Sequence, residues 1–188
     1  MKSVAIKLGC LFWFVSCFAS RALAAEQSAT GASGIVINEI RATGGDWIEL
    51  YNGGTAGTDL SDWRLADSGL GGEARLLAAV RFPRGTVIPA GGYFLVVSDG
   101  GKKNAAATRR LCSGRPAAPC LSAAWRIDKS KGETLRLFAA DDTITAEASI
   151  PPGAVPKGRT WARQPDGSGE FSVAEATPGR SNSRKGGK

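Results

Sequence analysis

The stretch that decides the fold begins with Ile35–Arg41 (IVINEIR), continues through Gly44-Gly45, and ends with Asp46–Tyr51 (DWIELY). Both runs are rich in the β-branched and aromatic side chains that favour strands, and polar residues are interspersed at short intervals. The two glycines between them can adopt the positive φ that a tight hairpin turn needs. The stretch therefore predicts an antiparallel β-hairpin.

Outward from this hairpin the same pattern continues, with short β-like runs separated by Gly- and Pro-containing turns and with no long helical period. The Pro165-Asp166-Gly167 turn predicts a second, late hairpin. The further runs that we expect to be strands are Trp63–Leu65, Leu77–Phe82, Tyr93–Ser98, Thr134–Phe138, Thr143–Ala148, Thr160–Arg163 and Phe171–Ala174. Regularly spaced short strands are typical of an all-β, immunoglobulin-like β-sandwich, which is the fold class that we predict.

The amino terminus has the order of a secretory signal peptide. Lys2 and Lys7 precede or flank a short apolar run, and small residues around Ala24 provide a cleavage site. The apolar run is shorter than the ~20 residues of a membrane-spanning helix. We expect residues 1–24 to be removed on export to the periplasm or the medium, with lipidation of Cys17 as an alternative.

The rest of the chain is expected to be one domain with polar ends. Residues 25–34 are small and polar and predict a flexible lead-in, residues 35–180 form the sandwich domain, and residues 181–188 predict a disordered basic tail. No second apolar stretch predicts a transmembrane segment in the mature chain, and the oligomeric state stays open.

Two cysteines remain in the mature chain, Cys112 and Cys120, on either side of a Gly- and Pro-containing segment. An oxidising compartment favours a disulfide between them. A zinc site is the weaker alternative, because the chain has no histidine and two thiols cannot complete one.

Seven phrases in the sequence resemble a known family when they are taken in order. They are Ile35–Ile40, Asp46–Asn52, Asp59–Leu65, Ile88–Tyr93, Gly132–Leu137, Trp161–Gly169 and Thr177–Asn182. Together they resemble the lamin tail domain as it occurs in bacterial secreted proteins. The resemblance implies an immunoglobulin-like sandwich and a non-catalytic module, which in bacteria often accompanies secreted hydrolases or surface proteins and in nuclear lamins meets protein partners and DNA. The segment 100–124 looks longer than the connection that the family usually has there.

Carboxylate and amide side chains gather around the first hairpin: Asn38, Glu39, Asp46, Glu49 and Asn52. Such oxygens suit calcium, and they also suit structural hydrogen bonds, for example between Asn38 and Glu49 across the hairpin. No calcium-loop spacing is present, so we expect structural pairing and no metal or other cofactor.

A carboxylate-free basic block lies in the segment 100–124, and Trp125 follows it. The block consists of Lys102, Lys103, Arg109, Arg110 and Arg115. These cations could contact DNA or an acidic envelope polymer, or form a solvated surface. We expect Trp125 to be partly exposed beside them and Trp63 to lie in the core.

Catalytic motifs are missing from the sequence. The absence of histidine removes Ser-His-Asp and Cys-His triads, and only a hydrolase using Glu39 and Glu49 stays open. We therefore predict an exported, non-enzymatic module that binds a protein or cell-envelope partner through sheet edges or the segment 100–124. The alternatives are a polyanion binder, a calcium-stabilised structural domain and a hydrolase.

Overall fold

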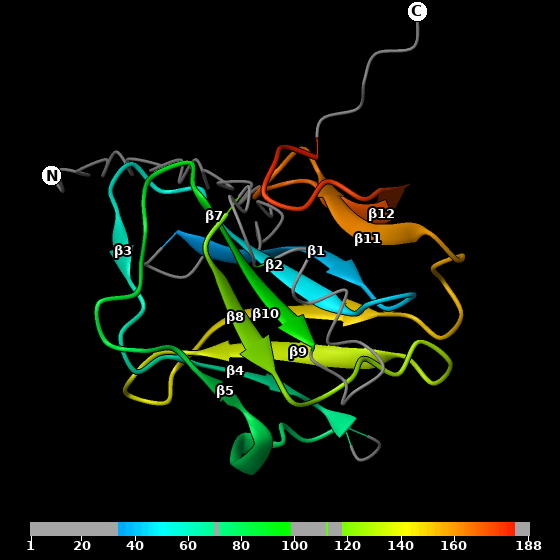
Figure 1. Ribbon diagram of the computed structural model, residues 1–188, viewed down its shortest axis with the longest axis horizontal. Helices are drawn as coiled ribbons and strands as arrows, with labels where there is room; N and C mark the ends of the chain where they lie inside the picture. Colours follow the sequence, from blue (N-terminus) through cyan, green and yellow to red (C-terminus); the bar gives the residue numbers. More distant parts are fainter. Residues whose placement is uncertain (1–33, 70–71, 99–111, 113–117, 183–188) are drawn as a thin grey trace, which may run out of the picture.

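The computed structural model describes residues 34–69, 72–98, 112 and 118–182. Its main sheet has six strands, in the order β12 (Glu170–Glu175), β11 (Arg159–Gln164), β1 (Ile35–Arg41), β2 (Trp47–Asn52), β7 (Tyr93–Ser98) and β8 (Cys120–Ala123). The second sheet has four strands, in the order β10 (Ile144–Ile150), β9 (Glu133–Phe138), β4 (Arg64–Asp67) and β5 (Val80–Arg81). Figure 1 shows the two sheets as separate layers.

The predicted first hairpin is present, with Gly44 and Gly45 at positive φ between β1 and β2. A register shift follows Ile37, and beyond it Glu39 lies directly opposite Glu49. Side chains alternate between the two faces of a strand, so such a shift changes which residues share a face. Here it brings two carboxylates to the same face of adjacent strands.

The main core fills the space between the two sheets. Ile35, Ile37 and Ile40 of β1 belong to it, as do Leu135 and Leu137 of β9. The Phe82 and Phe94 rings meet edge to face there, with their centroids 5.5 Å apart. The large buried apolar surface explains why the sandwich holds together.

A second buried layer covers the outer face of the six-stranded sheet. Trp47, Leu95, Val97 and Ala118 form a separate apolar cluster on this face. The segment Ala176–Asn182, which we call the C-terminal strap, follows β12 and runs back over the same face, where it bonds to residues of β1 and β2.

The structure adds small elements that the sequence pattern did not predict. They are β3 (Thr58–Asp59) paired with β6 (Val87–Ile88), the parallel edge strand β8, and the 3₁₀ helix η2 (Leu76–Ala78). The predicted strand Leu77–Phe82 was wrong in its first half, because Leu77 is fully exposed in η2 and only Val80 and Arg81 pair with β4.

Two further expectations need correction. Ser181 and Asn182, predicted to begin the disordered tail, belong to the strap, and only 2% of Asn182 is exposed. The signal peptide 1–24, the lead-in up to residue 33, Cys17 and residues 183–188 lie outside the described residues.

Candidate functional site

Asn38 is the centre of a buried polar network. Its Nδ2 donates to Glu49 Oε1 at 3.1 Å, which is the bond expected across the hairpin, and also to Asp166 Oδ1 at 2.8 Å. Its Oδ1 accepts the Gly167 backbone N–H at 3.0 Å. One amide side chain thus joins the first hairpin to the turn between β11 and β12.

The strap is bound to the sheet by the two facing glutamates. The Thr177 backbone N–H donates to Glu39 Oε1 at 3.1 Å, and the Thr177 hydroxyl donates to Oε2 at 2.9 Å. The Gly179 backbone N–H donates to Glu49 Oε2 at 2.6 Å. Both glutamates are 0% exposed, so the strap closes over them.

Asp166 binds the end of the strap from the other side. It accepts the Asn182 backbone N–H at 3.0 Å, the Ser181 hydroxyl, and the Tyr93 hydroxyl at 3.1 Å. The Asn182 side chain in turn donates to the Asn38 carbonyl oxygen at 3.3 Å. Three carboxyl groups from three separate elements therefore hold one short segment.

Burial determines the ionisation of this cluster. Burial is the main reason that the pKa of Glu49 is raised to about 8; the negative charges of Glu39 and Asp166 also act to raise it, and the Asn38 and Gly179 hydrogen bonds act to lower it. Burial also raises the pKa of Glu39, and burial followed by Asp166 raises the pKa of Tyr93. The cluster favours a protonated Glu49 near neutral pH.

The geometry argues against the hydrolase alternative. Paired carboxylates that cleave a bond need an open cleft between them. Here Glu39 and Glu49 are completely buried, and their oxygens already accept hydrogen bonds from the strap. The pair is arranged to hold protein backbone in place.

The two other residues of the predicted set lie elsewhere. Asp46 accepts the Ile127 backbone N–H at 3.2 Å, and burial raises its pKa. Asn52 donates to the carbonyls of Ala56 and Ile88, and so holds the connection after β2. Across the described ranges, no three Cys, Asp or Glu side chains are grouped to hold a metal ion.

The prediction that Trp125 is partly exposed is wrong, because its side chain is buried. It alternates with Ala123 and Ile127, and this period of two carries all three residues into the core, with 5% of Trp125 exposed. It borders a cavity of about 860 Å³ between the β1–β2 turn and η2. Its indole N–H has no hydrogen-bond partner among the described residues.

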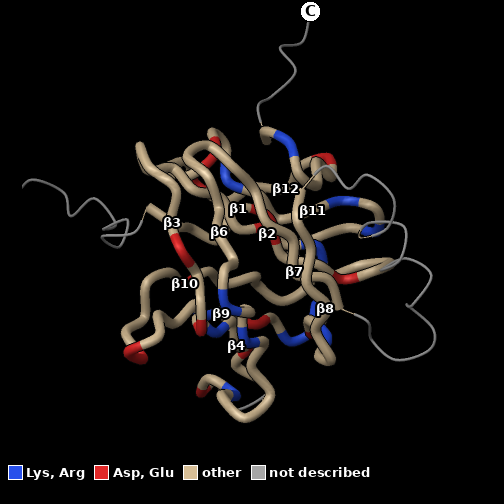
Figure 2. The backbone as a smooth tube through the Cα atoms, turned by 60° about the vertical axis from the view of Figure 1, so that its left-hand side comes forward, with Lys and Arg blue, Asp and Glu red and all other residues tan. Residues whose placement is uncertain are grey.

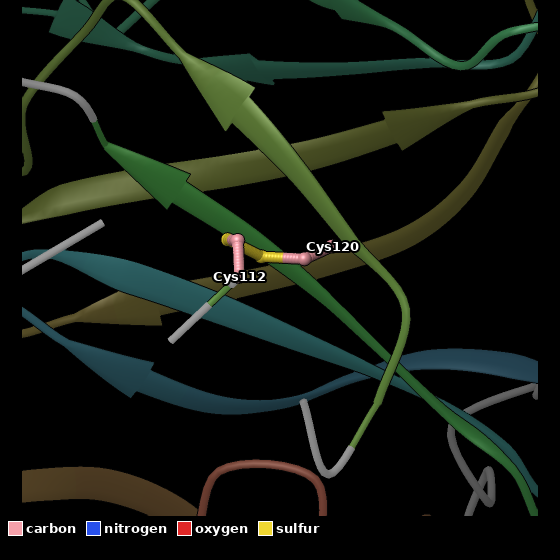
Figure 3. The surroundings of a disulfide bond; sticks show 2 residues. All are labelled: Cys112 and Cys120. Carbon is pink, nitrogen blue, oxygen red and sulfur yellow. A yellow bond between two sulfur atoms is a disulfide. The ribbon is translucent and has the colours of Figure 1, made fainter. Parts of the chain in front are cut away.

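Cys112 and Cys120 are joined by a disulfide, with 5.4 Å between their Cα atoms. Figure 3 shows the bond beside β7 and β8. The pairing agrees with the expectation from sequence, and both residues pack against the Trp47 cluster. The basic block Lys102, Lys103, Arg109, Arg110 and Arg115 lies outside the described residues.

The exposed charges of the described body are mixed in sign along the chain (Figure 2). Arg64 pairs with Asp142, Arg136 with Glu147, and Arg159 with Glu175. Surface pairs of this kind leave little excess charge for a polyanion.

The edge of β12 is the feature that the sequence could not identify. A groove of about 560 Å³ lies beside the second half of β12 and is lined by residues of β12, β11 and the strap. Val173 and Glu175 line it from one face of β12, and Ala174 lines it from the other. Of the Val173 residue, 39% is exposed.

Comparison with known proteins supports the fold and the general type of function. A comparison with curated proteins gives no match. In the described part of the chain, no helix is long and apolar enough to cross a membrane.

The family model described as "Lamin Tail Domain" matches residues 28–152, which include β1 to β10. β11 and β12 follow the matched region but complete its six-stranded sheet. The chain belongs to the lamin tail domain family, whose immunoglobulin-like domains are non-enzymatic interaction modules.

Proposed function

We propose that this protein is exported and binds an extended segment of a protein partner along the free edge of β12. Export is supported by the signal-peptide pattern of residues 1–24 and by the disulfide between Cys112 and Cys120. The periplasm or the medium is the proposed location. The observation that carries the binding proposal is the open, grooved edge of β12.

The four edges of the two main sheets differ in how they are protected. β5 has two residues and β8 has four, with Cys120 tied to Cys112. β10 contains a register shift after Ile144, and the Trp161 indole N–H donates to the Ser149 carbonyl of that strand at 3.1 Å. Short length, bulges and covering side chains all prevent an edge from pairing with another chain.

β12 has none of these protections in the described structure. Its six residues pair with β11 without a register shift and contain neither proline nor lysine. A strand added beside it would gain main-chain hydrogen bonds, and its alternating side chains would meet both walls of the groove. The edge therefore suits an extended polypeptide.

A second copy of this chain fits the edge less well. Antiparallel pairing of all six residues of β12 with their symmetry mates would place Glu170 opposite Glu175 at both ends. Like charges directly opposite each other destabilise strand pairs. A heterologous partner is the proposed occupant.

The test compares two single substitutions in capture experiments from the native envelope fraction. Val173→Lys adds a charge at the proposed edge, whereas Ile144→Lys adds it on β10, where 52% of Ile144 is exposed. We expect wild type and Ile144→Lys to retain the same protein and Val173→Lys to lose it at least about tenfold. Equal retention by all three proteins, or a Val173-dependent dimer of this chain in sedimentation, would rule out the proposal.

Polyanion binding through the basic block and the tail stays a prediction from sequence. Its cations lie outside the described residues, and the described arginines named above are paired with carboxylates. A steep loss of affinity with increasing salt would favour it over strand addition.

A further inference from the structure

We propose that the C-terminal strap is a pH-dependent latch on the β12 groove, closed in mild acid and progressively released between about pH 5 and pH 8. This inference deepens the proposed function, because it assigns regulation to the same binding site. The latch itself rests on the contacts between the strap and the sheet.

The first observation is that the strap is held through carboxyl groups. Thr177 bonds to Glu39 through both its backbone N–H and its hydroxyl, and Gly179 bonds to Glu49. Ser181 and Asn182 bond to Asp166. These bonds end on carboxyl groups, which can gain or lose a proton, and the Asn182 side chain adds one bond to the non-titrating Asn38 carbonyl.

The second observation is that, within the part of the chain that the structure describes, no ion pair balances these carboxyl groups. Among the described residues, no lysine or arginine forms an ion pair with Glu39, Glu49 or Asp166. A further titratable group that faces them is the Tyr93 hydroxyl from β7, which bonds to Asp166. Arg180, the one cation of the strap, is exposed and lines the groove.

The direction of the effect follows from proton linkage. In the closed state burial raises the pKa of Glu49 to about 8, whereas a hydrated glutamate has its ordinary value of 4.5. The closed state therefore binds more protons than the open state between these two pH values. Raising the pH through this window favours opening, which returns the carboxylates to water.

Opening of the strap would remodel the proposed binding groove directly. Thr177, Ser181 and Asn182 line the groove together with β12, so their release removes one of its walls. A partner segment that touches this wall would bind more tightly in mild acid. The latch thus links the protonation of Glu49 to the shape of the β12 site.

Hydrogen exchange of the whole purified protein, without any partner, tests the latch. The amides to follow are those of Thr177, Gly179 and Asn182, with rates divided by the intrinsic exchange rate at each pH. We expect their protection to fall at least about tenfold between pH 5.5 and pH 8, while amides of β9 change less than about threefold. The β9 amides separate local opening from global unfolding.

Two variants make the test specific. Glu49→Gln should reduce the fall in strap protection to less than about threefold, whereas Glu147→Gln, an exposed carboxylate on β10, should leave it as in wild type. If Glu49→Gln does not fold, Glu39→Gln replaces it, because Glu39 binds the same strap. The latch would be overturned if the strap amides of the wild type kept their protection from pH 5.5 to pH 8. It would also be overturned if the folded Gln variant lost that protection to the same extent as the wild type.

The failure of this inference and that of the proposed function can be told apart. The exchange measurement contains no partner, so it reports on the strap alone. Capture by the Val173→Lys and Ile144→Lys proteins at one fixed pH reports on the edge alone.

Discussion

The two outer faces of the sandwich differ in whether their acidic side chains are buried or exposed to water. On the six-stranded sheet, Glu39 and Glu49 are buried and bonded to backbone N–H groups of the strap. On the four-stranded sheet, Glu147 is bonded to Arg136 at 2.5 Å and reaches water. Both faces carry carboxylates, but only those of the six-stranded sheet are covered by another segment.

This difference determines how each face responds to its surroundings. An exposed acid beside an arginine stays in contact with water, and the pair contributes little to stability. A buried acid without a cation loses solvation on ionisation, so its protonation is coupled to the packing above it. The covered face should therefore control the stability of the protein and its dependence on pH.

The largest expected effect is the pH dependence of global stability. Because burial raises the pKa of Glu49 from 4.5 to about 8, its contribution is fully present below pH 4.5 and is lost as the pH rises through 8. The raised pKa of Glu39 acts in the same direction. The free energy of unfolding, measured with urea, should decrease by on the order of 2–4 kcal/mol between pH 5 and pH 9, because a shift of one pKa unit corresponds to about 1.4 kcal/mol. A free energy of unfolding that stays constant across this range would show that the buried carboxyl groups of the covered face do not make stability depend on pH.

Asn38→Ala should have the next largest effect. The substitution leaves Glu49, Asp166 and the Gly167 N–H without their shared amide partner inside a buried network. We expect a loss of about 2–4 kcal/mol in denaturant unfolding. Thr134→Ala is the matched control on the other face, where the Thr134 hydroxyl only meets Ser149 at an exposed position. Similar losses for the two variants would show that the buried network around Asn38 stabilises the protein no more than the exposed Thr134–Ser149 contact does.

Removal of the disulfide should have a smaller effect. Cys112 and Cys120 are separated by 8 positions, so the bond closes a short loop. Replacing both cysteines with serine should cost at most about 2–3 kcal/mol. Thermal unfolding of the variant beside wild type measures this, and free-thiol titration of the unfolded, unreduced wild type should find no reactive thiol. Two reactive thiols would contradict the bridge.

Glu147→Gln should have the smallest effect. It removes the charge that pairs with Arg136 on the exposed face, and 48% of the Glu147 side chain is accessible to water. We expect a change below about 1 kcal/mol that decreases further in high salt. A loss as large as that of Asn38→Ala would contradict the distinction between the faces.

Local sequence determined most of the strands and both hairpin turns. The range predicted for β1 is the observed Ile35–Arg41, and Tyr93–Ser98 is likewise the observed β7. These runs combine β-favouring side chains with glycine or proline turns, so nearby residues alone specify them. The pairing of Asn38 with Glu49 was also accessible, because a hairpin fixes which residues lie near each other.

Only the tertiary structure decided where the polar network closes and where the surface stays open. Asp166 and Thr177 lie more than a hundred residues from Asn38 and Glu39, and nothing local to either stretch indicates that they meet. Trp125 was misplaced for the same reason, because its burial depends on the parallel pairing of β8 with β7. Sequence specifies which segments become strands through local backbone preference. Long-range packing specifies which faces are covered, which edge is free, and which carboxyl groups lose their water.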